Sequence, residues 1–297
     1  MNAVTGALSY TGRAIAEELL ARGEPVRSLS RRDDPADPLR ASIDLRPLRF
    51  DDSLVDALAG VHTLYNTFWI RFARGTQTFD GAVQQSIELF EAARAAGVSR
   101  VVHVSVSHAD AADDLPYFRG KHQVERWLVE SDLEWAIVRP TLVFGPNDIL
   151  LNNIAWALRR LPLFLLPGRG GGSVQPVSLT DTARICVEAP AHAITNAAGP
   201  ETIDFGRLVE LVAGAVGSRA RIVAAPVGVG LATVALANLV LRDVVVTRDE
   251  LTGLSRSLLA TATPPLGSDR FSGWVETHGD QLGRAYTSEL GRNFRGA

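Results

Sequence analysis

The sequence predicts an α/β fold: a doubly wound parallel sheet followed by a smaller, mainly helical C-terminal lobe. Residues 1–110 alternate short runs rich in β-branched residues with helical segments, the pattern of a parallel sheet covered on both faces. A glycine-containing turn joins the first strand to the first helix, and apolar helices follow residue 147. We therefore expect a sheet domain at residues 1–147 and a lobe at residues 148–297, interleaved with the sheet domain and packed on it.

Composition limits the possible partners and compartment. The chain has 297 residues, 46% of them hydrophobic and 21% charged, and its net charge of −3 gives no general attraction to nucleic acid or to an anionic membrane. A single cysteine, Cys186, excludes an internal disulfide, and Met1 runs directly into a strand without an export signal, so we expect a cytoplasmic protein. The apolar run Pro226 to Leu241 is shorter than the roughly 20 residues of a membrane span. It predicts a buried helix that forms a lid over a cleft.

The first turn has the composition of a phosphate-binding loop. A strand at Asn2 to Thr5 leads through glycines into a helix, and phosphate is bound by bare backbone N–H groups at the positive end of a helix dipole. Gly6 is expected to make the tight turn, and Gly12 to let the helix pack on the strand. Ser9 stands between them, where its hydroxyl can donate to a phosphate oxygen. The alternative is a plain connecting turn. The candidate residues are Thr5, Gly6, Ser9, Tyr10, Thr11 and Gly12.

The end of the second strand indicates which dinucleotide is preferred. An acidic residue there would hold the ribose 2′-hydroxyl of NAD, but the strand Pro25 to Ser30 ends in Ser30-Arg31-Arg32. Two guanidiniums beside a small hydroxyl suit a 2′-phosphate, so NADP(H) is favoured over NAD(H). The alternatives are arginines on a solvated loop, or arginines paired with Asp33 and Asp34.

The third and fourth strands end in further candidates. Asp51 follows a strand at Leu45 to Phe50 and is placed to accept from an adenine amino group. The fourth strand runs from Val61 to Asn66, and Asn66 is a second candidate for binding the cofactor. Trp69 and Arg71 follow it, where open α/β sheets bind ligands. Arg71 is either a substrate contact or a surface cation beside a packed Trp69.

Serines and a tyrosine–lysine pair follow the fifth strand. A helix at Phe79 to Ala96 precedes this strand. The strand runs from Arg100 to Val106 and leads into Ser107 and His108. His108 is a candidate substrate contact or an ordinary loop histidine.

Lys121 is the only lysine among 30 basic residues, and Tyr117 precedes it by four positions, on the same face of a helix. A nearby ammonium favours the phenolate and lowers the pKa of a tyrosine. The pair therefore predicts a tuned proton donor, with a solvent-facing lysine beside a half-buried tyrosine as the alternative.

The second half of the chain supplies the variable part of the site. Asn153 and Trp156 lie on a helix just after Phe144-Gly145-Pro146, and the apolar helices Phe205 to Val216 and Val227 to Leu241 suit a roof over a hydrophobic cleft. Such a roof favours an apolar substrate. Residues 168–172, rich in glycine, are expected to form a flexible loop.

Other chemistries find no motif. The six histidines show no HExxH spacing or i, i+4 pairing, so a metal site is not expected. The chain also lacks a GxSxG nucleophile elbow and a Walker-type phosphate loop.

Taken in order, these residues resemble the short-chain dehydrogenase/reductase superfamily, in its extended and atypical branches of epimerase/dehydratase-like and NmrA-like NAD(P)H-binding proteins. The resemblance covers about the first 185 residues and implies a Rossmann fold. The segments that carry it are Thr5-Gly6 with Gly12, Asp51, the serines after the fifth strand, Tyr117 with Lys121 and Glu125, and Arg139-Pro140 through Pro146.

The resemblance implies roles by position. Tyr117 would be the general acid/base, Lys121 would hold the nicotinamide ribose and lower the tyrosine pKa, and Pro140 would border the cofactor. A serine would hydrogen-bond the substrate oxygen, but the usual position falls on Val106, so that Ser105 or Ser107 substitutes only if the strand end bends or bulges.

Three functions remain open. The first is an NADP(H)-dependent oxidoreductase acting on a carbonyl or alcohol of a small, largely apolar substrate. The second is an epimerase or dehydratase that retains its NAD(P), and the third is a non-catalytic NADPH-binding sensor or assembly protein. We expect a small-molecule substrate and no nucleic-acid or membrane partner, and a homodimer is left open.

Overall fold

The structure is a computed structural model that describes residues 1–167 and 172–293. The chain divides into two compact units: the first consists of Met1–Pro140 with Leu179–Ala197, and the second of Thr141–Ser178 with Ala198–Ala297. Residues 168–171 of the expected glycine-rich loop lie outside the described residues. Among the helices of the described ranges, none combines the length and hydrophobicity that a membrane crossing requires.

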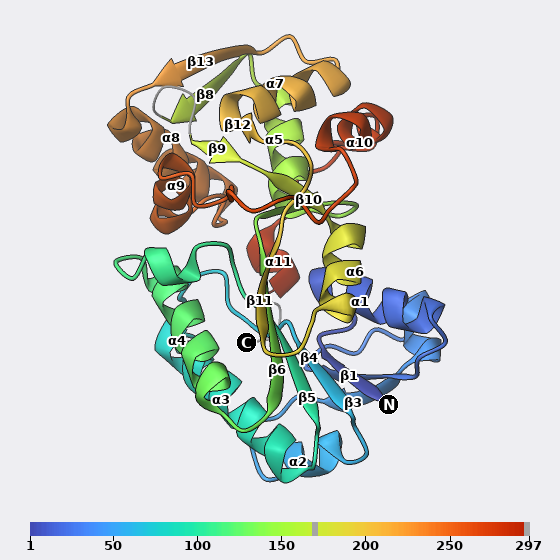
Figure 1. Cartoon of the computed structure of the whole chain (residues 1–297). Coiled ribbons are helices and arrows are strands. Elements are labelled where there is room, and N and C mark those ends of the chain that lie inside the picture. The colour runs from blue at the N-terminus through green and yellow to red at the C-terminus, as the bar shows by residue number, and fades with distance from the viewer. Residues whose placement is uncertain (168–171, 294–297) are drawn as a thin grey trace. The chain divides into compact units, whose positions relative to one another are not determined.

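Seven parallel strands form the sheet of the first unit (Figure 1). Their order is β11-β6-β5-β4-β1-β2-β3, so the winding reverses between β1 and β4, where open α/β sheets bind ligands. The predicted doubly wound parallel sheet is confirmed. The strands are β1 Asn2–Thr5, β2 Val26–Ser30, β3 Asp44–Pro47, β4 Thr63–Asn66, β5 Arg100–Val104, β6 Glu134–Pro140 and β11 Ala193–Ala197.

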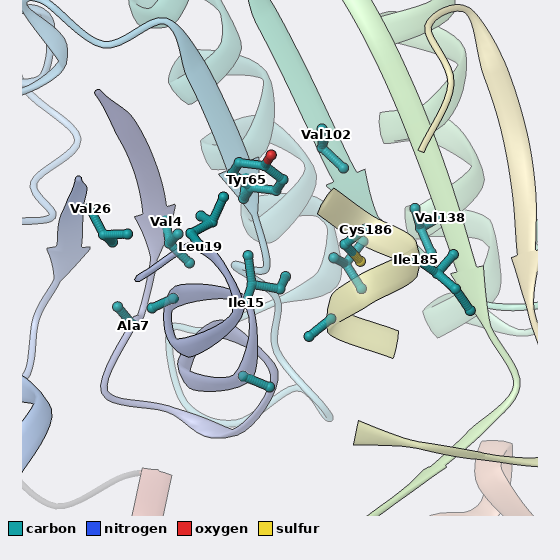
Figure 2. Packing of buried hydrophobic residues seen from close by; sticks show 14 of the residues in the cluster. Val4, Ala7, Ile15, Leu19, Val26, Tyr65, Val102, Val138, Ile185 and Cys186 are labelled. Carbon is teal, nitrogen blue, oxygen red and sulfur yellow. The ribbon is translucent and has the colours of Figure 1, made fainter. Parts of the chain in front are cut away.

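Helices cover both faces of this sheet because successive residues of its strands point to opposite sides. On one face, α1 (Tyr10–Ala21) and α6 (Leu179–Glu188) pack together over Val102. Figure 2 shows Ile185 and Cys186 of α6 in this layer. Burial raises the pKa of the Cys186 thiol to about 12, so that it stays protonated.

The opposite face is covered by α2 (Ser53–Leu58), α3 (Phe79–Ala95) and α4 (Pro116–Glu130). Val101, next to Val102 in β5, belongs to this second layer with Phe90 of α3 and Leu128 of α4. Figure 1 shows α3 and α4 on the side of the sheet away from α1 and α6. Two short 3-10 helices, Pro38–Ser42 and Ala109–Ala111, complete the unit.

The second unit contains three strand pairs and six helices in its described residues, and its core gathers around Phe144 and Phe271, whose ring centroids lie 5.3 Å apart. The pairs are β7 Leu142–Phe144 with β10 Pro176–Ser178, β8 Leu163–Pro167 with β13 Arg221–Ala225, and β9 Ser173–Val174 with β12 Ile203–Asp204. The helices are α5 Ile149–Arg160, α7 Phe205–Ala215, α8 Val227–Leu241, α9 Arg248–Ser255, α10 Phe271–His278 and α11 Glu289–Asn293.

The apolar run at residues 226–241 forms the predicted helix, but the prediction that this helix is buried is wrong. Leu239 is 74% exposed, Val240 71% and Val229 48%. An apolar composition all round a helix favours burial, and α8 departs from that rule; without periodicity, its sequence gives no sign of which side stays exposed.

Candidate active site

The turn after β1 has the geometry that its glycines predict. Gly6 has a φ of +65°, which a side chain would strain. A Cβ on Gly12 would lie 2.3 Å from the Gly6 carbonyl oxygen, so only glycine lets α1 pack this closely on the turn. Ser9 donates its hydroxyl proton to the same oxygen at 2.6 Å. Tyr10 and Thr11 then open α1, whose first turn contains no acidic residue to neutralise its positive end.

The arginines after β2 are both exposed. The guanidinium carbon of Arg31 lies 6.0 Å from the ring centroid of Phe68, and the backbone N–H of Arg32 donates to Ser30 Oγ at 2.9 Å. Asp33 forms an ion pair with Arg40 at 2.7 Å. The structure thus gives Asp33 a partner other than Arg31 and Arg32.

The third strand ends earlier than predicted, which changes the setting of Asp51. β3 ends at Pro47, so the prediction of a strand through Phe50 is wrong. Asp51 is exposed in the turn before α2, where its carboxylate accepts from the backbone N–H and the hydroxyl of Ser53. These hydrogen bonds lower the pKa of Asp51. Its assignment to the adenine amino group stays a prediction.

A buried hydrogen-bond network joins the ends of β1, β4 and β5. Thr5 Oγ1 accepts from the backbone N–H groups of Thr67 at 2.7 Å and Phe68 at 3.0 Å. Asn66 Oδ1 also accepts from the Phe68 N–H, so the Asn66 amide nitrogen is the atom 3.1 Å from His103 Nδ1. Because an amide nitrogen can only donate, His103 accepts through Nδ1 and carries its proton on Nε2.

His103, to which no sequence pattern assigned a role, is fully buried in this network. Burial, and after it the charge of Lys121, lowers the pKa of His103 well below its usual value, so the ring is neutral. Its Nε2 has no partner within the described ranges. A histidine inside the apolar run of the fifth strand was the available signal.

The predicted pair Tyr117 and Lys121 lies at the carboxyl end of β5. Lys121 is only 3% exposed, and its Nζ donates to the Val104 carbonyl at 2.7 Å. The same Nζ lies 4.6 Å from the ring centroid of Trp69, and Tyr117 meets that indole edge-on, with centroids 6.2 Å apart. The alternative of a solvent-facing lysine is therefore wrong, and both side chains contact one shared indole.

Burial lowers the pKa of Lys121 to about 7, and the nearby Glu125 opposes part of this shift. At neutral pH the amine is therefore close to half protonated. An anionic group bound beside it would favour the ammonium.

Trp69 is held in place by residues on two helices. A Cβ on Gly120 of α4 would lie 3.0 Å from the indole, and Phe79 of α3 stacks on it with centroids 6.4 Å apart. Its Nε1 is buried and has no hydrogen-bond partner among the residues that the structure describes. Trp69 therefore forms a wall beside Lys121.

The serines after β5 continue its regular pairing. The N–H of Ser105 donates to the Val138 carbonyl at 2.7 Å, and that of Ser107 to the Pro140 carbonyl at 2.9 Å. This two-residue interval turns both serines to one face of the sheet and Val106 to the other. Ser105 Oγ is buried, with no hydrogen-bond partner in residues 1–167 and 172–293.

An ion-pair network fixes α4 on the sheet. Arg139 of β6 binds both carboxylate oxygens of Glu125, at 2.9 and 2.5 Å, and also Asp110 at 3.0 Å. Glu125 is buried, and a bidentate arginine restricts its orientation. Since Glu125 lies one turn beyond Lys121, this network also fixes the register of the lysine over β5.

The remaining candidates lie in different settings. Arg71 is half-buried after β4, His108 has a φ of 56° before the 3-10 helix Ala109–Ala111, and Pro140 ends β6. Asn153 and Trp156 belong to the second unit, where Asn153 bonds the backbone of Thr287 and Trp156 packs on Tyr286. Their assignment to a substrate stays a prediction.

Comparison with known proteins supports a dinucleotide site. Residues 6–147 match the model of an NAD(P)H-binding family. The sterol demethylase protein B of Methylococcus capsulatus is 42% identical over 173 residues, 49% of this chain and 52% of that protein. The chain spans 52% of this relative and 22% of the matching mycobacterial proteins, so the curated relatives are longer.

Two solved structures match most of the chain. The triphenylmethane reductase of Citrobacter sp. has a TM-score of 0.77 at 18% identity, over 95% of this chain and 99% of that one. The NADPH-dependent quinone oxidoreductase of Escherichia coli, in complex with NADPH, has a TM-score of 0.75 at 21% identity, over 93% and 99%.

A dinucleotide fits the residues of the first unit. The close contact between Gly12 and Gly6 leaves the backbone of the turn bare. Three buried polar atoms have no hydrogen-bond partner among the described residues: Ser105 Oγ, His103 Nε2 and Trp69 Nε1. Residues 6–147 are therefore similar to NAD(P)H-binding proteins, and the chain has a Rossmann-like fold that it shares with the two solved reductases above.

Proposed function

We propose that this protein is an NADP(H)-dependent oxidoreductase that reduces a carbonyl, or oxidises an alcohol, of a small and largely apolar substrate. The observation that carries this proposal is the burial of the only lysine of the chain, Lys121, on the indole that also contacts Tyr117. A buried amine is costly to maintain, so a role in chemistry accounts for it better than a role in stability.

The cofactor would be held by groups at the carboxyl ends of β1, β2 and β4. The turn at Gly6 and Gly12 offers bare backbone to the pyrophosphate, and the positive end of α1 faces the same charge. Arg31 and Arg32 would bind a 2′-phosphate, and Asn66 is held rigidly beside the turn. When bound, the nicotinamide supplies the hydride.

Tyr117 would move the proton. Its hydroxyl donates to the substrate oxygen on which negative charge develops, and the Lys121 ammonium favours the phenolate that remains. Ser105, whose buried hydroxyl has unused hydrogen-bonding capacity among the described residues, would orient that oxygen. Trp69 and Phe79 exclude water from one side of the tyrosine.

An apolar substrate is supported by these aromatic rings and by the relatives. The names of the three relatives reported above refer to a sterol, a quinone and triphenylmethane dyes, which are built largely of hydrocarbon rings. Arg71 and His108 would contact its polar end.

The test is Tyr117→Phe, measured with NADPH and a panel of quinones and ketones. We expect the turnover number to fall by about 10²- to 10⁴-fold, while the Kd for NADPH from fluorescence titration stays within about twofold. Tyr65→Phe is the matched control, because it removes a phenol hydroxyl from the same unit in the layer facing α1 and should leave turnover unchanged. Unchanged activity of Tyr117→Phe would remove this residue from the mechanism.

Two outcomes would favour the other functions. A nucleotide released from the purified protein on denaturation, together with isomerisation and no net consumption of NADPH, would indicate an epimerase. NADPH binding without turnover across the whole panel would indicate a sensor or assembly protein.

A further inference from the structure

Helix α8 presents an apolar face to solvent. Within the described side chains of this helix, the exposed positions are 228, 229, 232, 233, 235, 239 and 240, while 234, 237, 238 and 241 are partly covered. At 100° per residue the exposed positions fall on one side of the helix and the covered ones on the other. The exposed side consists of Gly, Val, Ala, Thr and Leu, with no charged residue.

This face belongs to an anchored helix. The Asn238 side chain accepts from the Val245 N–H at 2.8 Å, and Asp243 accepts from the Tyr286 hydroxyl and from the first two backbone N–H groups of α11. Burial would raise the pKa of Asp243, but these hydrogen bonds outweigh it and lower the pKa. Leu239 therefore follows directly after Asn238, whose side chain is held by a hydrogen bond. Its exposure is part of the folded unit.

β8, which α8 contacts, and its partner strand β13 also expose apolar side chains. β8 and β13 pair in parallel, and one face of this pair packs in the core through Phe164 and Ile222. The opposite face exposes Leu163 and Val223, which are 44% and 45% accessible. Exposed apolar surface gathered in one region of a folded protein marks an interaction site.

The charges around α8 indicate what covers it. Residues 211–242 contain three arginines and no acidic residue, although the whole chain has a net charge of −3. Arg219 and Arg221 precede the helix, Arg242 ends it, and all three are exposed. An apolar face that is flanked in the chain by exposed cations complements a bilayer that has an acyl interior and an anionic surface.

We infer that the α8 surface, defined by Val229, Leu239 and Val240, docks on an anionic lipid bilayer. The helix has 15 residues and is about 22 Å long, too short for a hydrocarbon core of about 30 Å, so it lies in the interface without crossing. A second copy of the chain fits less well, since its copy of this surface is also flanked by arginines and offers no complementary charge.

The test is flotation of the full chain with vesicles of phosphatidylcholine containing phosphatidylglycerol, compared with phosphatidylcholine alone. We expect binding to the anionic vesicles, a loss of about tenfold or more in Leu239→Ser/Val240→Ser, and a similar loss in Arg219→Gln/Arg221→Gln/Arg242→Gln. Val129→Ser, at a valine on α4 of the first unit that is 41% exposed, is the control and should bind like the wild type. Thermal unfolding of each variant confirms that it folds.

Several results would overturn the inference. One is failure of the wild type to bind anionic vesicles, and another is equal binding by Leu239→Ser/Val240→Ser. Equal binding to both kinds of vesicle would refute the role of the arginines. If the double serine variant dissociated a dimer in sedimentation, without vesicle binding by the wild type, the surface would be a contact between two copies.

Discussion

Replacement of Lys121 by methionine should remove a specific pH dependence from the stability of the protein. Burial lowers the pKa of Lys121 from 10.5 to about 7. The unfolded chain therefore holds a proton that the folded chain releases between these two values. Burying the amine costs stability below pH 7, and the cost is relieved as the pH rises toward 10.5.

The magnitude follows from the linkage relation. Each pH unit over which one extra proton stays on the unfolded chain adds about 1.4 kcal/mol to the free energy of unfolding. From pH 7, where the folded amine is about half protonated, to pH 9, the gain for the wild type is about 2 kcal/mol. Lys121→Met has a side chain of similar length and no titration, so it should lack this gain.

The assay is urea unfolding followed by tryptophan fluorescence at pH 7, 8 and 9, for the wild type and for Lys121→Met. The difference between the two free energies of unfolding should change by about 2 kcal/mol over this range in favour of the wild type. Arg126→Met on the same helix, at a largely exposed arginine, controls for loss of a cation and should give a constant difference. If Lys121→Met and the wild type change in parallel with pH, the amine is not desolvated as we describe.

Three further perturbations test other parts of the first unit. Gly12→Ala places a Cβ against a carbonyl oxygen and should lower stability by about 1–3 kcal/mol in thermal unfolding, whereas Gly214→Ala, with open space around it, should be neutral or stabilising; equal effects would contradict the packing argument. Arg31→Ala/Arg32→Ala should raise the Kd for NADPH by on the order of 100-fold and that for NADH by less than about twofold, and equal losses would mean that these arginines do not read a 2′-phosphate. Arg139→Met leaves a buried carboxylate unpaired and should lower the free energy of unfolding by about 3–5 kcal/mol in urea, and a loss under about 1 kcal/mol would contradict this.

The parts of the fold that follow from local chemistry could be predicted from the sequence. Gly6 and Gly12 stand where the backbone leaves no room for a side chain, and the lone Lys121 marked the helix that follows β5. β3 was misplaced because it is a short edge strand, Asp-Leu-Arg-Pro, without an apolar run to mark it. β11, with the sequence AITNA, was missed because its pairing with β6 is set by the tertiary fold and not by its own propensity.

Contacts between distant segments could not be predicted. The bond between Asn66 and His103 joins residues 37 positions apart, and it depends on β4 and β5 being neighbours in the sheet. The face occupied by Ser105 depends on how far pairing with β6 continues past the end of β5. The sequence leaves open which serine near the end of β5 serves the site. Only the backbone geometry shows which residues turn toward α4.

The single thiol of the chain is a natural reporter of how often the sheet domain opens. Cys186 is fully buried on the side of α6 that packs in the layer over the sheet and keeps its proton, so a thiol-reactive dye can attack only after this layer has separated from the strands. Its labelling rate therefore measures how often the layer opens, without any engineered probe. A cofactor that tightens the domain should slow this rate in proportion to its occupancy.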